Sequence, residues 1–117
     1  MKILFYDTKS YDREFFEKLL PSYPGIEIKF IEANIHEETA ALAHGYDAIC
    51  AFVNADLGAP VIEELHRQGV KLILMRCAGY NNVDLETTAK CGIQVARVPG
   101  YSPEAVAEHA MGLALTA

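Results

Sequence analysis

Five short apolar runs recur along the chain at nearly equal spacing, and this recurrence restricts the folds that the chain can adopt. Each run has the length and the β-branched or aromatic content that is typical of a buried strand. The runs are KILFY (2–6), IEIKFI (26–31), DAICAFV (47–53), KLILM (71–75) and IQVA (93–96). Their first residues are 24, 21, 24 and 22 positions apart, so every connection has room for a helix. Because neighbouring parallel strands need crossovers of about a dozen residues or more, the spacing predicts a parallel sheet.

The connections between these runs carry helix signals. Pro60 stands near the start of GAPVIEELHRQG, and Gly69 closes it. In VDLETTAKCG, Asp84 is a suitable N-cap and Gly92 a suitable stop. Alternating strands and helices of this kind predict an α/β fold with helices on both faces of the sheet. We expect a flavodoxin-like, doubly wound, five-stranded parallel sheet with strand order 2-1-3-4-5.

The length, charge and cysteine content of the chain limit the classes of function that it can have. A chain of 117 residues with 51% hydrophobic and 22% charged residues is expected to form one globular domain. Its net charge of −6 argues against binding to nucleic acid or to an anionic membrane surface, because both attract basic patches. No run is long enough to span a bilayer, and the apolar start is too short for a signal peptide. The three cysteines lack CxxC spacing, so we expect free thiols in a cytoplasmic protein.

The segment RCAGYNNVD (76–84) follows the fourth run and has almost no side chain at Ala78 and Gly79. In a doubly wound sheet, ligands bind beyond the carboxyl ends of the strands, where this segment is expected to begin. Backbone amides with so little side chain around them can approach a ligand closely, and they would suit a carboxylate or a phosphate. Arg76 beside them is a further substrate-binding candidate. The alternative is a tight turn that needs Gly79 for its dihedral angles. For Arg76 the alternatives are fixing the loop through hydrogen bonds or pairing with an acid.

A final helix is predicted from Ser102, as its N-cap, and Pro103, as its first residue, to the end of the chain. Its polar residues form one narrow stripe, and the remainder is mostly alanine, valine, methionine and leucine. So wide an apolar arc needs burial on more than one side. One sheet can cover only part of it, so we expect the rest to be open to water. Self-association through residues 103–117 into a homodimer or a larger homo-oligomer is the expected outcome.

Four stretches resemble the amino-terminal part of the D-specific 2-hydroxyacid dehydrogenases, and most of all the bacterial fermentative NAD-dependent enzymes for D-lactate. They are YDTKSYD, AFVNAD, KLILMRCAGYNNVDL and ARVPGYSPEAVAEHAMGLAL. The resemblance covers the chain from Met1 to Ala117. It implies a flavodoxin-like substrate domain built from both ends of a longer chain, with a Rossmann domain for NAD between them. It also implies reduction of pyruvate to D-lactate by NADH in dimers or larger oligomers.

The resemblance further assigns individual residues. Ala78 and Gly79 match the loop whose backbone amides hold the substrate carboxylate. Tyr101 matches an aromatic residue that closes over the substrate from the hinge. Phe52 matches a position that faces the substrate side chain, where an apolar ring suits a small methyl group. Val106 matches a position near the nicotinamide of the cofactor.

By the same resemblance, the catalytic Arg, Glu and His and the GxGxxG phosphate loop lie beyond residue 117. The glycines of the chain, at 25, 45, 58, 69, 79, 92, 100 and 112, form no such pattern. Residues 1–100 are therefore expected to be an incomplete substrate domain, and 101–117 the hinge and first helix of an NAD-binding domain. We expect the chain alone to be inactive and to bind no NADH. No histidine or cysteine spacing indicates a metal site.

Three other functions share the predicted topology. A phospho-receiver domain needs a hydroxyl after the fourth strand and a Lys after the fifth, where this chain has Arg76, Cys77 and Arg97. A flavodoxin needs a glycine-rich phosphate loop after the first strand, and DTKSYD has hydroxyls but no glycine. A stand-alone interaction domain without catalysis, with the last helix as its partner surface, is compatible with the composition.

Overall fold

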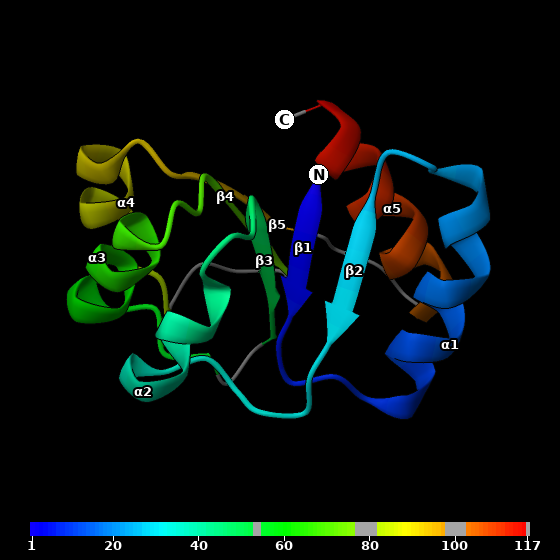
Figure 1. The fold of residues 1–117 in the computed structure, drawn as a ribbon, viewed down its shortest axis with the longest axis horizontal. Coiled ribbons are helices and arrows are strands. Elements are labelled where there is room, and N and C mark those ends of the chain that lie inside the picture. Colours follow the sequence, from blue (N-terminus) through cyan, green and yellow to red (C-terminus); the bar gives the residue numbers. More distant parts are fainter. Residues whose placement is uncertain (53–54, 77–81, 98–102, 117) are drawn as a thin grey trace.

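The computed structural model describes residues 1–52, 55–76, 82–97 and 103–116, and it confirms the predicted sheet. Five parallel strands lie in the order β2-β1-β3-β4-β5. They are β1 (Lys2–Phe5), β2 (Glu27–Phe30), β3 (Ala48–Ala51), β4 (Leu72–Met75) and β5 (Gln94–Arg97). Figure 1 shows helices on both faces of this sheet.

The helices alternate with the strands, as the spacing predicted. They are α1 (Ser10–Leu19), α2 (Glu37–Ala40), α3 (Ala59–Arg67), α4 (Leu85–Cys91) and α5 (Pro103–Thr116), with 3-10 turns η1 (Leu20–Ser22) and η2 (Ala41–Ala43). Asp84 is the N-cap of α4, and its carboxylate accepts a hydrogen bond from the backbone N–H of Thr87 at 3.1 Å. Gly92 ends α4 in the left-handed region at φ +71°, a conformation that favours glycine.

The strand register brings the carboxyl ends of the central strands together. Ala51 of β3 lies opposite Met75 of β4. The residues that follow them, Phe52 and Arg76, therefore leave the sheet at the same edge, where β1 also ends, at Phe5. This is the edge at which ligands bind in open α/β sheets.

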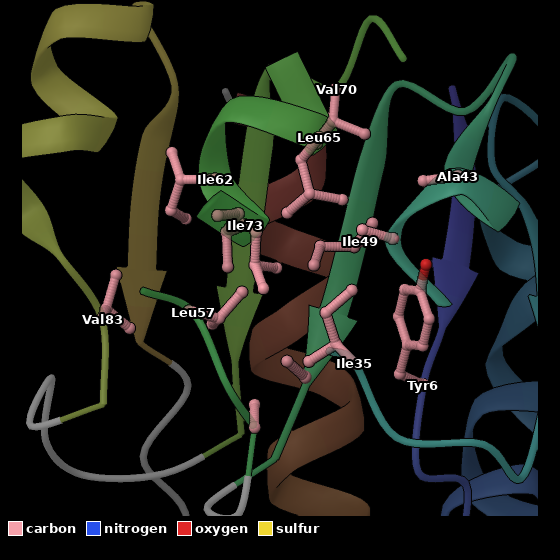
Figure 2. Packing of buried hydrophobic residues seen from close by; sticks show 14 of the residues in the cluster. Tyr6, Ile35, Ala43, Ile49, Leu57, Ile62, Leu65, Val70, Ile73 and Val83 are labelled. Atoms are coloured by element: carbon pink, nitrogen blue, oxygen red, sulfur yellow. The ribbon is translucent and has the colours of Figure 1, made fainter. Parts of the chain in front are cut away.

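One apolar core fills the face of the sheet that α2, α3 and α4 cover. Alternate residues of the strands point into it, because successive side chains of a strand point to opposite faces. We call it the α3-side core, and Figure 2 shows how its side chains pack between α3 and the strands. Its strand and α3 members are Leu4, Tyr6, Ile49, Ala51, Ile73, Met75, Val61, Ile62 and Leu65.

A second apolar core lies on the opposite face, under α1 and α5 (Figure 1). We call it the α1-side core; its members are Ile3, Phe5, Phe16, Ile26, Ala48, Cys50, Leu72, Leu74, Ala107, Ala110, Met111 and Ala114. The four members from α5 are at most 3% exposed. These residues are the part of the apolar arc that the chain's own sheet covers, whereas Ala105 is exposed and Val106 is half-buried. Since α1 alone leaves part of this face uncovered, α5 packs beside it, and its alanines allow close approach.

Candidate functional site

The candidate site is the carboxyl edge of the sheet, where the predicted substrate residues were expected. Of these, the structure describes Phe52, Arg76 and Val106. The remaining three, Ala78, Gly79 and Tyr101, lie outside the described residues. The site is therefore built here from the residues that surround those segments.

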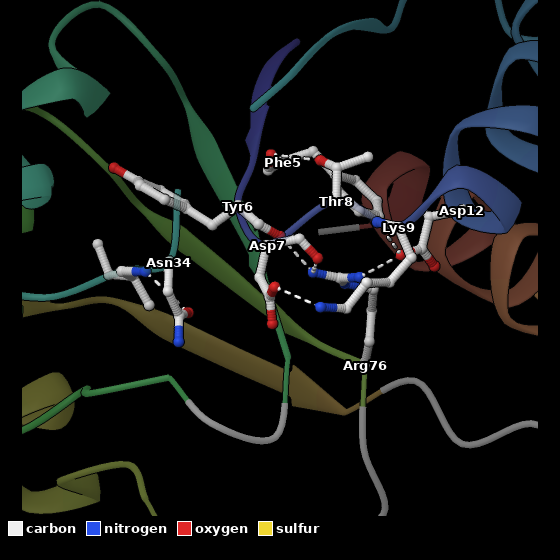
Figure 3. A network of polar contacts seen from close by, with 9 residues as sticks. Phe5, Tyr6, Asp7, Thr8, Lys9, Asp12, Asn34 and Arg76 are labelled. Carbon is white, nitrogen blue, oxygen red and sulfur yellow. Dashed lines mark hydrogen bonds and ion pairs between the residues drawn. The ribbon is translucent and has the colours of Figure 1, made fainter. Parts of the chain in front are cut away.

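Arg76 is the first residue after β4, and it is buried. Its side chain is 2% exposed, and its Nη1 donates to Oδ2 of Asp12 at 2.7 Å (Figure 3). Its Nη2 donates to the backbone carbonyl of Tyr6, and also to that of Asp7 at 3.2 Å. Of the two alternatives that the sequence left open for this residue, pairing with an acid is thus observed. The guanidinium joins the ends of β4 and β1 to the first turn of α1.

Two aromatic rings flank the same guanidinium. The Cζ atom of Arg76 lies 4.1 Å from the ring centroid of Phe5 and 5.0 Å from that of Phe52. Both distances are within the range of a cation–π interaction, which is stronger where water is excluded. Phe52, which the resemblance places against the substrate side chain, is half-buried and in contact with Arg76.

Asp12 is positioned by its place at the start of α1. It is 4% exposed, and its Oδ2 also accepts a hydrogen bond from the backbone N–H of Lys9 at 3.0 Å. The carboxylate therefore satisfies one of the amides that a helix start leaves without a partner. No sequence pattern indicates this pair, because its two residues are 64 positions apart and no local motif marks either of them.

The end of β1 turns sharply beside this network. Asp7 has a φ of +50°, which is uncommon outside glycine. Its backbone N–H donates to the carbonyl of Ala33 at 2.8 Å, and its carboxylate pairs with Nζ of Lys9 at 2.9 Å. These bonds hold the turn in a conformation that a free chain seldom adopts.

The chain that returns after residue 81 is fixed to the segment that follows β3. Asn82 donates its side-chain amide to the carbonyl of Ala55 at 2.8 Å. Leu57 donates its N–H to the carbonyl of Asn82 at 3.2 Å, and Asp84 donates its N–H to the carbonyl of Leu57 at 2.9 Å. Leu57 and Val83 form a parallel bridge. Residues 82–84 are therefore held against residues 55–57 by side-chain and backbone hydrogen bonds.

A small cavity of about 240 Å³ lies beside the first turn of α1. It is lined by Thr8, Lys9, Ser10, Arg13, Phe30, Ile31 and Glu32. Its charged residues carry both signs, and Arg13 is paired with Glu17 at 2.8 Å. The cavity is therefore not specialised for an anion.

Val106, which the resemblance places near the nicotinamide, is half-buried and packs against the α1-side core. In the part of the chain that the structure describes, no three His, Cys, Asp or Glu side chains are grouped so that they could hold a metal ion. None of the described helices has the length and apolar character to cross a membrane.

Comparison with known proteins gives one family. The model for the catalytic domain of the D-isomer specific 2-hydroxyacid dehydrogenases matches residues 3–116. The D-lactate dehydrogenase of Escherichia coli K12 is 48% identical over 116 residues, which are 99% of this chain and 35% of that protein. The D-lactate dehydrogenase kk1H of Curvularia clavata is 47% identical over 119 residues, covering 99% of this chain and 34% of that protein.

Solved structures agree with this assignment. The apo-structure of the E. coli D-lactate dehydrogenase matches with a TM-score of 0.82 over 99% of this chain and 37% of that one, at 48% identity. An NAD-complexed D-isomer specific 2-hydroxyacid dehydrogenase from Lactobacillus delbrueckii ssp. bulgaricus matches with a TM-score of 0.77 over 98% and 35%, at 28% identity. The chain thus spans about a third of the length of these relatives.

Proposed function

Because the chain belongs to the D-isomer specific 2-hydroxyacid dehydrogenases, we propose that it is the substrate-binding part of a longer D-lactate dehydrogenase. That enzyme would reduce the carbonyl of pyruvate to the hydroxyl of D-lactate. Support for this substrate comes from two relatives with 48% and 47% identity, both of which are named D-lactate dehydrogenases.

One observation supports the proposal: Arg76 and Asn82, the described residues on either side of segment 77–81, are both bonded to residues at the end of β3 or just after it. Arg76 donates its N–H to the carbonyl of Ala51 at 2.8 Å at one end, and Asn82 is bonded to Ala55 at the other. We assign the backbone amides of Ala78 and Gly79 to the substrate carboxylate, since amides at a strand end suit an anion. Fixed ends would limit the movement of those amides, and pre-organised donors bind more tightly than mobile ones.

The walls of the proposed site come from aromatic residues. We assign Phe52 to contact with the methyl group of pyruvate. We assign Tyr101, at the hinge, to closing over one face of the substrate. Phe52 is half-buried at the site edge, so its ring has one part in the protein and one part available to a ligand. A small apolar wall would favour a 2-oxo acid with a small apolar side chain over one whose side chain is charged.

The cofactor of the proposed enzyme is NAD, whose reduced form, NADH, would supply the hydride for pyruvate reduction. The described residues do not form a dinucleotide site by themselves, since no GxGxxG segment occurs in the sequence. We assign Val106 of α5, which is half-buried, to a position near the nicotinamide. We assign the phosphate loop, and the acid–base and orienting side chains, to the part of the proposed enzyme outside this chain. On this assignment the 117-residue chain neither binds NADH nor turns over pyruvate.

We also propose a domain boundary near residue 100, with residues 101–117 as a hinge and the first helix of the cofactor domain. Association of two or more copies would use residues 103–117. Ala105 of α5 is exposed and Val106 is half-buried, so part of this helix faces away from its own sheet. Sedimentation of this chain and of a chain cut after Pro99 tests the association: only the longer one should form dimers at high micromolar concentration.

The proposed compartment is the cytoplasm. Among the described residues, Cys50 and Cys91 are free thiols, and Cys50 is buried. Buried free thiols persist in reducing compartments, whereas secreted proteins of this size commonly use disulfides. Fractionation of the source cells, with an antibody raised against the chain, would test this assignment.

A chimera tests the proposed function. In it, this chain replaces the aligned third of the E. coli D-lactate dehydrogenase, to which it is 48% identical. We expect the chimera to oxidise NADH with pyruvate, and the chain alone to give neither NADH binding nor turnover. A chimera that folds and binds NADH but reduces no 2-oxo acid would contradict the proposal.

A further inference from the structure

Arg76 directly precedes segment 77–81, which is proposed to bind the substrate, yet the polar atoms of its side chain face the protein. Its Nη1 donates to Asp12 and its Nη2 to two carbonyls at the end of β1. Its Nε is buried and has no hydrogen-bond partner within the described residues. With its charge matched by Asp12 and its side chain 2% exposed, it is poorly placed to receive a substrate carboxylate.

Stability alone does not account for such an arrangement. A buried ion pair often adds no stability over apolar residues of the same volume, because both charges must leave water. The buried Nε, which has no hydrogen-bond partner within the described residues, adds a further unfavourable contribution to the free energy of folding, since its desolvation penalty is not offset. A role in fixing geometry is consistent with both observations.

The geometry that Arg76 fixes is that of two neighbouring parts of the site. Its backbone is the last described point before segment 77–81, and its guanidinium ties this point to β1 and α1. The Cζ atom of this guanidinium also lies 5.0 Å from the ring centroid of Phe52 and 4.1 Å from that of Phe5. One side chain thus contacts the wall proposed for the substrate methyl group and precedes the loop proposed for its carboxylate.

We propose that Arg76 is a positioning residue that sets the side-chain specificity of the site by holding the ring of Phe52, and that it does not itself bind the substrate. Asp12 fixes the guanidinium for this task. The inference rests on the proposed function, since it takes Phe52 to be the wall for the substrate side chain. It replaces the direct substrate contact that the sequence indicated for Arg76.

The test compares Arg76→Lys, Phe52→Leu and the double variant in the chimera, with pyruvate and with a longer unbranched 2-oxo acid as substrates. A lysine keeps the charge beside Asp12 but lacks the planar guanidinium that stacks on aromatic rings and holds its donors in a fixed array. If Arg76 acts through Phe52, Arg76→Lys changes the ratio of kcat/KM between the two substrates. The double variant should then differ from the product of the single effects by at least about threefold, as expected for coupled neighbours.

Two controls separate this role from the alternatives. Arg13→Lys alters an exposed ion pair on α1, the helix that carries Asp12. It should leave the ratio of kcat/KM between the two substrates unchanged, because the guanidinium of Arg13 is outside the Arg76 network. The KM for NADH should stay the same in Arg76→Lys. If Arg76→Lys fails to fold, the pair Asp12→Leu with Arg76→Met replaces it, since apolar replacement of a buried pair is commonly tolerated.

The outcomes are distinct. A carboxylate ligand at Arg76 would lower kcat/KM equally for both substrates and add independently to Phe52→Leu, which would overturn the inference. A purely structural role would lower the urea midpoint but leave the substrate ratio of the folded enzyme unchanged, which would also overturn it. Failure of the proposed function would show earlier, as an unsubstituted chimera without activity.

Discussion

Oδ2 of Asp12 lies 2.7 Å from Nη1 of Arg76, and their side chains are 6% and 2% exposed. The pair joins the first turn of α1 to the end of β4 across 64 residues of sequence. Removing one partner leaves the other as an uncompensated buried charge, whereas removing both does not.

Asp12→Ala should therefore lower the free energy of unfolding by about 3–5 kcal/mol. The double substitution Asp12→Leu with Arg76→Met should come close to the unsubstituted chain. Urea unfolding of the 117-residue chain, followed by circular dichroism, measures both. An Asp12→Ala variant within about 1 kcal/mol of the unsubstituted chain would mean that water reaches the guanidinium.

The α3-side core supplies a second test. Ile62 is fully buried on the inner face of α3, and Ile62→Ala should lower the free energy of unfolding by about 3 kcal/mol through lost transfer energy and the cavity that remains. Leu42 is 54% exposed, so Leu42→Ala should change stability by less than about 0.5 kcal/mol. Equal losses for the two variants in urea unfolding would contradict the packing of α3.

A third prediction concerns the α5 contact. Met111 is 1% exposed in the α1-side core, and Met111→Asp should destabilise the chain by at least about 3 kcal/mol because it buries a charge. His109 is exposed on the same helix, so His109→Asp is the matched control and should have little effect. If Met111→Asp is as stable as the control, α5 does not pack on its own sheet in solution.

The buried thiol of Cys50 predicts a pH dependence. Burial raises its pKa from 9.0 to about 11, although the Arg76 guanidinium lowers it in part. Because the raised pKa favours the protonated thiol in the folded state, its contribution is present below pH 9 and is lost as the pH rises towards 11. The unsubstituted chain should therefore lose more stability than Cys50→Ala between these values.

Thiol labelling provides an independent readout. At pH 8 iodoacetamide should modify Cys91, which is partly exposed, before Cys50, which is buried. Mass spectrometry of the two tryptic peptides measures the rates, and urea should abolish the difference. Equal labelling rates for the two thiols in the native chain would show that the α1-side core is open to the reagent.

Much of the fold could be predicted from the sequence because local signals and global topology agree. The even spacing of the apolar runs predicted the strand order, and Asp84 and Gly92 predicted the ends of α4. The packing of α5 was not foreseen, since its amphipathic pattern gives the width of its apolar arc but not which surface covers it. That surface is the part of the sheet beside α1, where residues of both helices share one core.

The site was predictable in part for a similar reason. Strand ends indicated where to look and led to Arg76, whereas Phe52 was indicated by the family resemblance. The partners of Arg76 were missed, because Asp12 and Phe5 reach it through tertiary packing rather than through any local spacing. Their detection from sequence would need paired changes in many relatives.

The central claim is that backbone amides at Ala78 and Gly79 bind the substrate carboxylate. The kinetics of Gly79→Val in the chimera with the E. coli enzyme test it most directly. A β-branched side chain at this position would obstruct the carboxylate, so the KM for pyruvate should rise about 10- to 100-fold, the equivalent of one or two charge-assisted hydrogen bonds. The KM for NADH should be unchanged. A folded Gly79→Val chimera with unaltered pyruvate kinetics would contradict the account.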